Sequence, residues 1–404
     1  MTVYPGLIES FSQVGLPKVK KKGPAQKAKP KNEGAEYWNP YVRPEKEALD
    51  EYEPKEDALA GLRKLGFTAA LVARDKPIFS GTSDLVSLEN GTANEQVLKE
   101  KVAQTVIFKR PGGFRSRTYP NSLMGVIALI RQTLLDAQWY GQAQAAYALN
   151  PKQTRPETDE SLAALQDVVK GKQPVLFKVD NDLNFLRAVK VAKEFGLKTW
   201  VLGSGHEYRQ LEAIKAAGVP VILPLDFPEP PKVESPEEAL DVSLLELSHW
   251  DAAPANPKDL YDAGVSFTFT TARLKKTTDF PERVRQALKR GLPEDAALAA
   301  LTVNPARLFG VADRLGTVET GKLGHLVVTD GDLFGEKTHI LDVWVDGHRY
   351  EIEARPEVDP RGAWELTFNL PEKAVPSLRL RIQGEPKKLN GKVVRDNTEI
   401  KLKT

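Results

Sequence analysis

The chain has 404 residues, 41% of them hydrophobic and 28% charged, and its formal net charge is +2. This length predicts one large domain with one or two small ones, and the near-neutral charge argues against a general attraction to nucleic acid or anionic membranes. The absence of cysteine excludes disulfides, thiol nucleophiles and thiolate metal sites. No apolar run approaches the roughly 20 residues of a transmembrane helix, and the residues after Met1 do not form a signal-peptide pattern.

The first part of the chain alternates short apolar runs with loops. Residues 3–9 (VYPGLIE) predict a strand. Residues 17–32 are rich in Lys, Pro and Gly, and because no aromatic residue separates the lysines we expect a solvated loop rather than a polyanion-binding patch. Residues 57–65 predict a helix that ends at Gly66, and residues 67–73 predict a strand. Parallel α/β barrels repeat this helix-to-strand unit.

The middle of the chain continues this pattern. Residues 78–82 and 85–88 together suggest one further strand with an irregular entry, another strand is expected at 105–109, and a long helix at 126–140 (VIALIRQTLLDAQWY). The intervening loop carries three arginines, Arg110, Arg115 and Arg117, for which a surface position is favoured over anion binding. Strands then follow at 175–179, 199–202, 219–223 and 265–270, and helices at 183–195 and 207–217. Eight strand positions can be counted, which predicts a (β/α)8 TIM-like barrel with its active site at the C-terminal strand ends.

Residues 291–350 form an ordered pattern of a helix, Asn304-Pro305-Ala306, a second short helix ending at Gly310, and three short strands closing on Val345-Asp346-Gly347. This stretch resembles the C-terminal closure of the amidohydrolase superfamily, in which the last barrel helix leads into a small β-sandwich. The resemblance extends over residues 4–370. Segments such as LDAQWY, WVLGSGHEY and FTFTTARLKKTTDF resemble tandem bacterial members, whose first half lacks the metal histidines and whose second half keeps them.

The resemblance implies a barrel over residues 1–310, a composite β-sandwich segment over 311–354 and a β-rich appendage over 355–404. In the family, sandwich strands normally precede the first barrel strand. Here residues 3–9 correspond to that barrel strand, so we expect the chain to be a fragment or to have a truncated N-terminus. The compartment stays open, with periplasmic or secreted relatives expected.

The family resemblance also implies a binuclear metal site with ligands on five barrel strands: His-x-His on strand 1, Lys or Glu on strand 4, His on strands 5 and 6, and Asp on strand 8. Only five histidines are present in the chain. The residues at the corresponding positions are Phe11 and Gln13 on strand 1, Lys109 on strand 4, Asp180 on strand 5, His206 on strand 6 and Ala272 or Arg273 on strand 8.

Most of these replacements cannot do the work of the originals. A phenyl ring cannot bind a metal, a glutamine amide is a poor zinc ligand, and an arginine is neither ligand nor general base. His206 is the one candidate metal ligand, and His206 with Asp180 is a candidate acid–base pair, although a structural role for His206 is preferred. Gln13, Lys109, Asp226 and Arg273 are expected to line the barrel mouth as binding residues. The expected cofactor is none, or one weakly bound divalent metal such as zinc.

Three functional interpretations follow. The family implies a hydrolase of non-peptide carbon–nitrogen bonds that uses a metal-activated water. The replaced ligands favour a degenerate domain that supports an intact amidohydrolase half or subunit. The alternatives are a hydrolase with a reduced site around His206, and a module that binds a small molecule or glycan in the vacated mouth. No nucleic-acid partner is expected.

Overall fold

The computed structural model describes residues 1–17, 35–111, 119–353, 360–366, 378–385, 388–395 and 398–401. The chain forms two compact units, Met1–Ile352 and Glu353–Thr404, and each is described by itself. The predicted lysine-rich loop, from residue 18 on, and Arg115 and Arg117 lie outside the described residues. Within the described part, no helix has both the length and the apolar character needed to cross a membrane.

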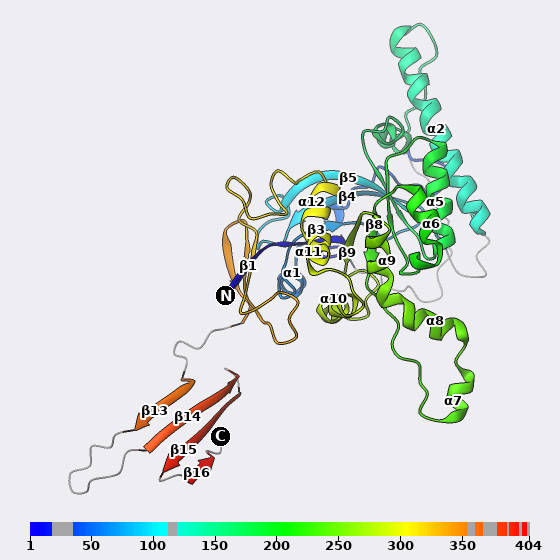
Figure 1. Cartoon of the computed structure of the whole chain (residues 1–404). Helices are drawn as coiled ribbons and strands as arrows, with labels where there is room; N and C mark the ends of the chain where they lie inside the picture. Colours follow the sequence, from blue (N-terminus) through cyan, green and yellow to red (C-terminus); the bar gives the residue numbers. More distant parts are fainter. Residues whose placement is uncertain are drawn as a thin grey trace, which may run out of the picture. The chain divides into compact units, whose positions relative to one another are not determined.

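An eight-stranded sheet forms the centre of the first unit and confirms the predicted TIM-like barrel (Figure 1). Its strands follow one another in chain order: β2 (Leu7–Ser12), β3 (Phe67–Val72), β4 (Phe79–Ser87), β5 (Val97–Ile107), β6 (Val175–Lys178), β7 (Thr199–Leu202), β8 (Val221–Pro224) and β9 (Phe267–Thr270). Most positions in these strands are buried, because a parallel sheet is covered on both faces.

One part of the barrel differs from the prediction of eight repeated β–α units. Strand β4 is antiparallel to both neighbours, β3 and β5, whereas the other paired strands are parallel. No helix lies between β3 and β4 or between β4 and β5, and a chain that returns without a crossover can only pair antiparallel. The segment after residue 35 runs along β4 instead, with single bridges from Val42 to Phe79 and from Glu47 to Thr82.

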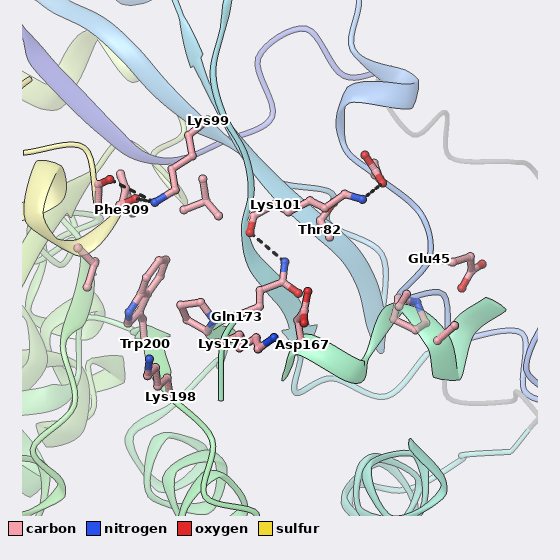
Figure 2. Close-up of a pocket in the computed structure, with 18 residues that line it drawn as sticks. Glu45, Thr82, Lys99, Lys101, Asp167, Lys172, Gln173, Lys198, Trp200 and Phe309 are labelled. Atoms are coloured by element: carbon pink, nitrogen blue, oxygen red, sulfur yellow. Dashed lines mark hydrogen bonds and ion pairs between the residues drawn. The ribbon is translucent and has the colours of Figure 1, made fainter. Parts of the chain in front are cut away.

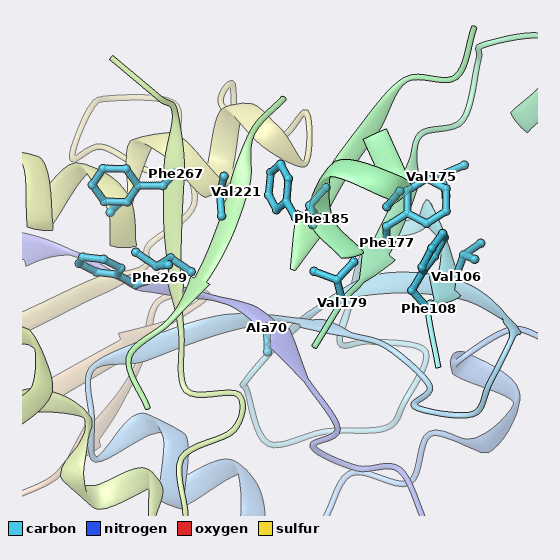
Figure 3. Close-up of a cluster of buried hydrophobic side chains, with 14 of the residues drawn as sticks. Ala70, Val106, Phe108, Val175, Phe177, Val179, Phe185, Val221, Phe267 and Phe269 are labelled. Carbon is cyan, nitrogen blue, oxygen red and sulfur yellow. The ribbon is translucent and has the colours of Figure 1, made fainter. Parts of the chain in front are cut away.

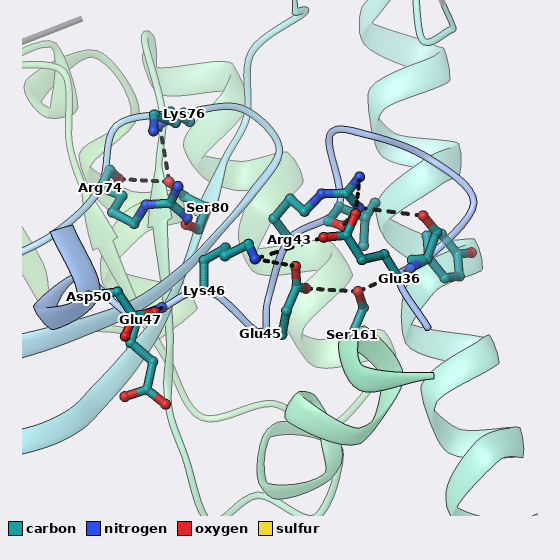
Figure 4. Close-up of polar contacts among 12 residues, drawn as sticks. Glu36, Arg43, Glu45, Lys46, Glu47, Asp50, Arg74, Lys76, Ser80 and Ser161 are labelled. Atoms are coloured by element: carbon teal, nitrogen blue, oxygen red, sulfur yellow. Dashed lines mark hydrogen bonds and ion pairs between the residues drawn. The ribbon is translucent and has the colours of Figure 1, made fainter. Parts of the chain in front are cut away.

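Ion pairs hold this covering segment in place (Figure 4). Arg43 pairs with Glu36 at 3.1 Å, and the hydroxyl of Ser161 donates to Glu45 at 2.8 Å. Further along, Arg74 pairs with Glu51 at 2.8 Å. The Ser161 contact joins the segment to the helix that spans Glu160–Ala164, the Arg74 contact joins it to the loop after β3, and the Arg43 pair lies within the segment.

Helices surround the rest of the barrel. They are α1 (Glu56–Arg63), α2 (Leu123–Leu149), α3 (Glu160–Ala164), α4 (Gln166–Val169), α5 (Asp182–Glu194), α6 (Leu211–Ala217), α7 (Pro236–Asp241), α8 (Leu244–Ala252), α9 (Asn256–Asp262), α10 (Phe280–Lys289), α11 (Glu294–Leu301) and α12 (Val303–Leu308). Helix α2 extends well beyond the predicted residues 126–140, and the residues of its last two turns are half-buried or exposed.

Alternating strand residues build two apolar layers. Phe177, Val221 and Phe269 belong to the outer apolar layer, together with Phe185 of α5 (Figure 3). A second cluster, containing Ile8, Leu71, Leu176, Leu202 and Ile222, fills the barrel interior. The two layers follow from the two-residue period of a strand, which sends successive side chains to opposite faces.

A small antiparallel sheet completes the first unit, in the order β1 (Thr2–Pro5), β10 (Leu326–Thr329), β11 (Ile340–Val345) and β12 (His348–Glu351). The predicted single strand over residues 3–9 is therefore two strands, and one strand of the small sheet does precede the barrel. The break falls at Gly6, where a Cβ would lie 2.2 Å from the hydroxyl of Thr68. The division at residue 310 stays a prediction.

The second unit contains a four-stranded antiparallel sheet, which agrees with the alternating polar and apolar pattern of the tail. Its strands are β13 (Gly362–Leu366), β14 (Leu378–Glu385), β15 (Lys388–Arg395) and β16 (Thr398–Lys401), paired in chain order.

A buried carboxylate joins the first and last barrel strands. Glu9 is fully buried, and among the described residues no backbone ladder pairs β2 with β9. Its carboxylate accepts hydrogen bonds from the Thr270 hydroxyl, from the Thr271 N–H at 2.9 Å and from the Phe11 N–H at 3.1 Å. Burial raises the pKa of Glu9, and these three donors oppose that shift.

We expect Glu9→Ala to lower the free energy of unfolding by roughly 3 kcal/mol or more, because it leaves buried donors on both strands without an acceptor. Glu9→Gln is the matched control: it keeps the shape and one carbonyl acceptor, and its loss should be about half as large. Urea unfolding followed by tryptophan fluorescence measures both. A loss below about 1 kcal/mol for Glu9→Ala would show that Glu9 does not hold the barrel closed.

Candidate functional site

A cavity of about 510 Å³ lies at the C-terminal ends of the barrel strands, which is the face that carries active sites in this type of barrel. Phe11 and Gln13 line it after β2, Asp75 after β3, Lys178 at the end of β6 and Arg273 after β9. Two of the predicted binding residues, Gln13 and Arg273, therefore share one cavity.

Lys178 was missed by the sequence reasoning, which placed Asp180 at the functional end of this strand. Its ammonium lies 2.7 Å from a carboxylate oxygen of Asp75 and 5.1 Å from the ring centroid of Phe11, and its side chain is 20% exposed. Burial lowers the pKa of Lys178; Asp75 opposes this shift, while Arg273 and Lys109 add to it. The sequence could have indicated Lys178, because alternate residues of a strand lie on the same face and residue 176 was expected to be buried.

Arg273 reaches across the mouth from β9 toward β6. Its guanidinium donates to the backbone carbonyl of Val179, and within the described part of the chain its buried Nε has no hydrogen-bond partner. The backbone of Arg273 has φ +71°, in the left-handed region that a non-glycine residue rarely occupies. Such backbone strain concentrates at functional sites and requires support from the surrounding structure.

The other two predicted binding residues stand at the edge of this mouth. Lys109 follows β5, is exposed, and acts on Lys178 through its charge. Asp226 follows β8 and is partly buried. Burial raises the pKa of Asp226 to about 6; Arg273 lowers it, and the neighbouring Glu207 raises it further.

The proposed pair of His206 and Asp180 is not formed. Asp180 is exposed and accepts hydrogen bonds from the side chains of Asn181 at 3.0 Å and Asn184 at 2.6 Å, at the start of α5. No hydrogen bond or ion pair links it to His206 in the residues that the structure describes. Asp180 therefore contacts the first residues of α5, where a negative charge interacts favourably with the N-terminus of the helix.

His206 instead stacks on His249 of α8. The two rings lie 4.0 Å apart at an interplanar angle of 11°. Nδ1 of His206 lies 3.1 Å from the Ser204 carbonyl, and Nδ1 of His249 lies 3.0 Å from the Tyr208 hydroxyl. Burial lowers the pKa of His206 and lowers that of His249 to about 4, where the neighbouring His206 contributes as well. Two neutral rings can stack without repulsion, so the pair fastens α8 to the barrel.

The loop that carries His206 depends on a further carboxylate that sequence reasoning missed. Glu207 is fully buried, accepts from the Ser204 N–H at 2.6 Å and accepts from the Asn256 side chain at 2.8 Å. Its partner Asn256 begins α9, about fifty residues away in the sequence, so no local pattern could have predicted this contact.

The residues at the mouth do not fit the metal centre that the family implies. Phe11 has no donor atom, and two cations, Lys178 and Arg273, stand where acceptors would be needed. Throughout the described residues, no three His, Asp or Glu side chains gather in a way that could hold a metal ion. His206 contributes at most one ligand, which alone binds zinc poorly. The prediction of one weakly bound metal stays a prediction.

A second cavity, of about 530 Å³, lies at the opposite end of the strands (Figure 2). Two of its cations are paired: the ammonium of Lys99 donates to the Phe309 carbonyl at 2.8 Å, and Lys101 pairs with Glu47 at 2.7 Å. The ring centroids of Trp200 and Phe309 lie 5.6 Å apart, and both side chains pack at the N-terminal end of the barrel interior. These contacts belong to the end of the barrel that provides stability, so the C-terminal mouth is the better functional candidate.

Comparison with known proteins agrees with this architecture. The sequence model of the amidohydrolase family matches residues 157–350. Amidohydrolase tasK of Hapsidospora irregularis is 34% identical over 97 residues, which are 23% of this chain and 10% of that protein. The urease alpha subunit of Yersinia pestis (strain Pestoides F) is 30% identical over 129 residues, which are 26% of this chain and 22% of the subunit. The matches thus span between a tenth and about a fifth of these relatives.

The fold is also that of a solved amidohydrolase from Thermotoga maritima MSB8, with a TM-score of 0.68 and 21% identity over 86% of this chain and 87% of the other. A mostly parallel eight-stranded barrel with a small antiparallel sheet defines the class of protein. Residues 157–350 therefore match the amidohydrolase family, and the fold of the chain is that of a solved amidohydrolase. The further resemblance to the first half of tandem members stays a prediction.

The raised pKa of Asp226 predicts a pH-dependent stability. An acid whose pKa is higher in the folded state costs stability once it ionises, so the free energy of unfolding falls as the pH rises from about 4 to above 6. Asp226→Asn removes this cost. We expect the free energy of unfolding of the variant, minus that of the wild type, to be roughly 1–3 kcal/mol larger at about pH 8 than at about pH 4.

Thermal unfolding at both pH values measures this gain. Asp180→Asn, at an exposed carboxylate of the same end of the barrel, controls for the loss of one negative charge. An Asp226→Asn effect that is equal at both pH values would contradict the assignment of a buried, protonatable carboxylate.

Proposed function

We propose that this chain is a degenerate amidohydrolase domain whose barrel mouth binds a small molecule with a carboxylate group, in place of metal-dependent hydrolysis. The observation that carries the proposal is the presence of Lys178 and Arg273 in one cavity at the C-terminal strand ends. Carboxylates are the natural partners of a guanidinium and an ammonium in a partly desolvated site.

The pairing of the charges at the mouth favours an anion beside Arg273. Lys178, Arg273 and Lys109 lie close enough for the last two to lower the pKa of the first, so each cation repels the others. Two acidic residues, Asp57 and Asp75, also line the cavity; Asp75 pairs with Lys178, and within the described residues no acidic side chain forms an ion pair with Arg273. An entering carboxylate would relieve the remaining repulsion and supply an acceptor for Arg273. The volume of about 510 Å³ suits a small ligand.

Succinate and its neutral diamide are matched probes of this anion site. We expect succinate to bind with measurable heat and succinamide to bind at least roughly tenfold more weakly, because charge-assisted hydrogen bonds are the stronger ones. Arg273→Gln should weaken succinate binding by a similar factor. The control is Arg285→Gln, since Arg285 pairs with Glu282 on the helix surface and does not line the cavity.

Equal binding of the acid and the diamide, or equal losses in the two arginine variants, would contradict an anion site. A carbohydrate panel in the same calorimeter distinguishes the glycan-binding alternative, for which the arginine would not be needed.

The loss of the metal centre is tested separately. After loading with zinc or manganese and desalting, we expect mass spectrometry to find far less than one metal per chain, because the mouth offers cations in place of ligands. Retention of about one metal per chain, abolished in His206→Ala, would instead support a reduced-site hydrolase. The His249→Ala variant serves as the control, because it disturbs the stacked pair without removing His206.

A second proposal concerns the partner. We propose that the chain supports an intact amidohydrolase half or subunit, and an apolar stripe on α2 favours such an interface. Leu135, Trp139 and Leu149 are 53%, 62% and 89% exposed and recur at helical spacing with Met124, which is 80% exposed. A helix face of this kind on a soluble chain marks an interaction surface.

An amidohydrolase barrel with an intact His-x-His strand, taken from the same gene or its neighbour, is the partner to mix with this chain. We expect a complex in sedimentation velocity that Trp139→Lys weakens at least roughly tenfold, as for a central aromatic contact. Ala148→Lys, exposed on the other face of α2, is the matched control. A self-associating chain that ignores the added barrel would show that the stripe serves a second copy instead.

A further inference from the structure

Lys178 differs from the other lysines of the chain. Among the described lysines with a shifted pKa, Lys101, Lys258 and Lys289 are shifted upward by an acidic partner, whereas Lys178 is shifted downward by burial. It also lies inside a cavity, on the inner face of a barrel strand, against an aromatic ring. A lysine amine becomes nucleophilic when it is desolvated or placed beside another cation, and Lys178 meets both conditions.

We propose that Lys178 is a carbonyl-reactive amine that forms an imine with small oxo acids, with Asp75 exchanging the proton and Arg273 holding the ligand carboxylate. The inference rests on the proposed function, because it uses the same anion site. It adds the class of ligand, a carboxylate that also carries an aldehyde or ketone group.

The geometry supplies a group for each step of the addition. Asp75, 2.7 Å from the ammonium, takes its proton and leaves the free amine. The amine nitrogen attacks the carbonyl carbon, a carbon–nitrogen bond forms as the carbonyl π bond breaks, and one of the two hydrogens on the nitrogen passes as a proton to the oxygen to give a neutral carbinolamine. Asp75 then returns its proton to the hydroxyl, which leaves as water while the nitrogen lone pair forms the imine double bond. The hydrogen that remains on the nitrogen is released as a proton, so no oxidant or reductant is required.

The remaining residues select and confine the ligand. Arg273 lines the same cavity as Lys178, so its guanidinium can bind a carboxylate while the carbonyl end of the ligand faces Lys178. The Phe11 ring covers one side of the ammonium and replaces water there. A small oxo acid therefore has its two functional groups matched by two different residues.

Reductive trapping tests the inference. The intact chain is incubated with glyoxylate and sodium cyanoborohydride, which reduces an imine to a stable secondary amine, and the labelled lysines are mapped by peptide mass spectrometry. We expect Lys178 to be labelled at least roughly tenfold faster than the exposed Lys172 and Lys198, since a lowered pKa raises the fraction of free amine. The three rates come from one sample, so the comparison needs no variant.

Variants then separate the roles. Lys178→Arg keeps the charge and should abolish the fast-labelled site. Asp75→Asn should slow labelling of Lys178 and change its pH profile, because the proton acceptor is lost. Arg273→Gln should remove the preference for glyoxylate over propionaldehyde, a neutral aldehyde of similar size, while Arg285→Gln should keep it.

The outcomes distinguish this inference from the proposed function. Arginine-dependent succinate binding with Lys178 labelled no faster than Lys172 would overturn the imine and leave the anion site standing. Fast labelling of Lys178 with equal rates for glyoxylate and propionaldehyde would keep the reactive amine and overturn the carboxylate clamp. Slow, uniform labelling together with no succinate binding would overturn both.

Discussion

The first unit depends on the buried carboxylate of Glu9. Strand β2 and strand β9 are the two ends of the barrel sheet, and the contacts of Glu9 with Thr270 and Thr271 join them where no backbone ladder does. Burying a carboxylate is unfavourable, and the three donors around Glu9 offset that cost. The same contacts fix the residues that follow on each strand, Phe11 and Arg273. The contacts of Glu9 that close the barrel therefore also position residues at its mouth.

The contacts that hold the barrel are largely separate from the charged residues at its mouth. The frame is held by two apolar layers and by Glu9, and Phe11 at the end of β2 belongs to the inner layer. The charged residues Lys178 and Arg273 belong to neither layer. Fold and site have separate physical origins here, which is why the fold does not by itself determine the reaction.

The sequence predicted the parts of the fold that local patterns determine. Most barrel strands were found because buried parallel strands form short apolar runs between turn residues. The antiparallel orientation of β4 was not predicted, because it follows from the absence of a connecting helix on either side of β4 and not from the composition of the strand. The split at Gly6 depends on pairing between β1 and β10, more than three hundred residues apart. At the site, Gln13 and Arg273 line the mouth cavity, and their binding role stays a prediction. The stacking of His206 on His249 and the pairing of Lys178 with Asp75 join distant segments, which local patterns do not predict.

The lysines at the two ends of the barrel have different surroundings, and this difference supports the proposed ligand site at the C-terminal end. At the N-terminal end, Lys99 satisfies the last carbonyls of α12 and Lys101 is neutralised by Glu47, so both stabilise the fold. At the C-terminal end, Lys178 has one acidic partner but two cationic neighbours, Arg273 and Lys109. A fold does not gain stability by placing two further cations beside one partly buried ammonium. Such an arrangement is retained where an anionic or carbonyl-bearing ligand completes it, and the cavity at this end provides the space.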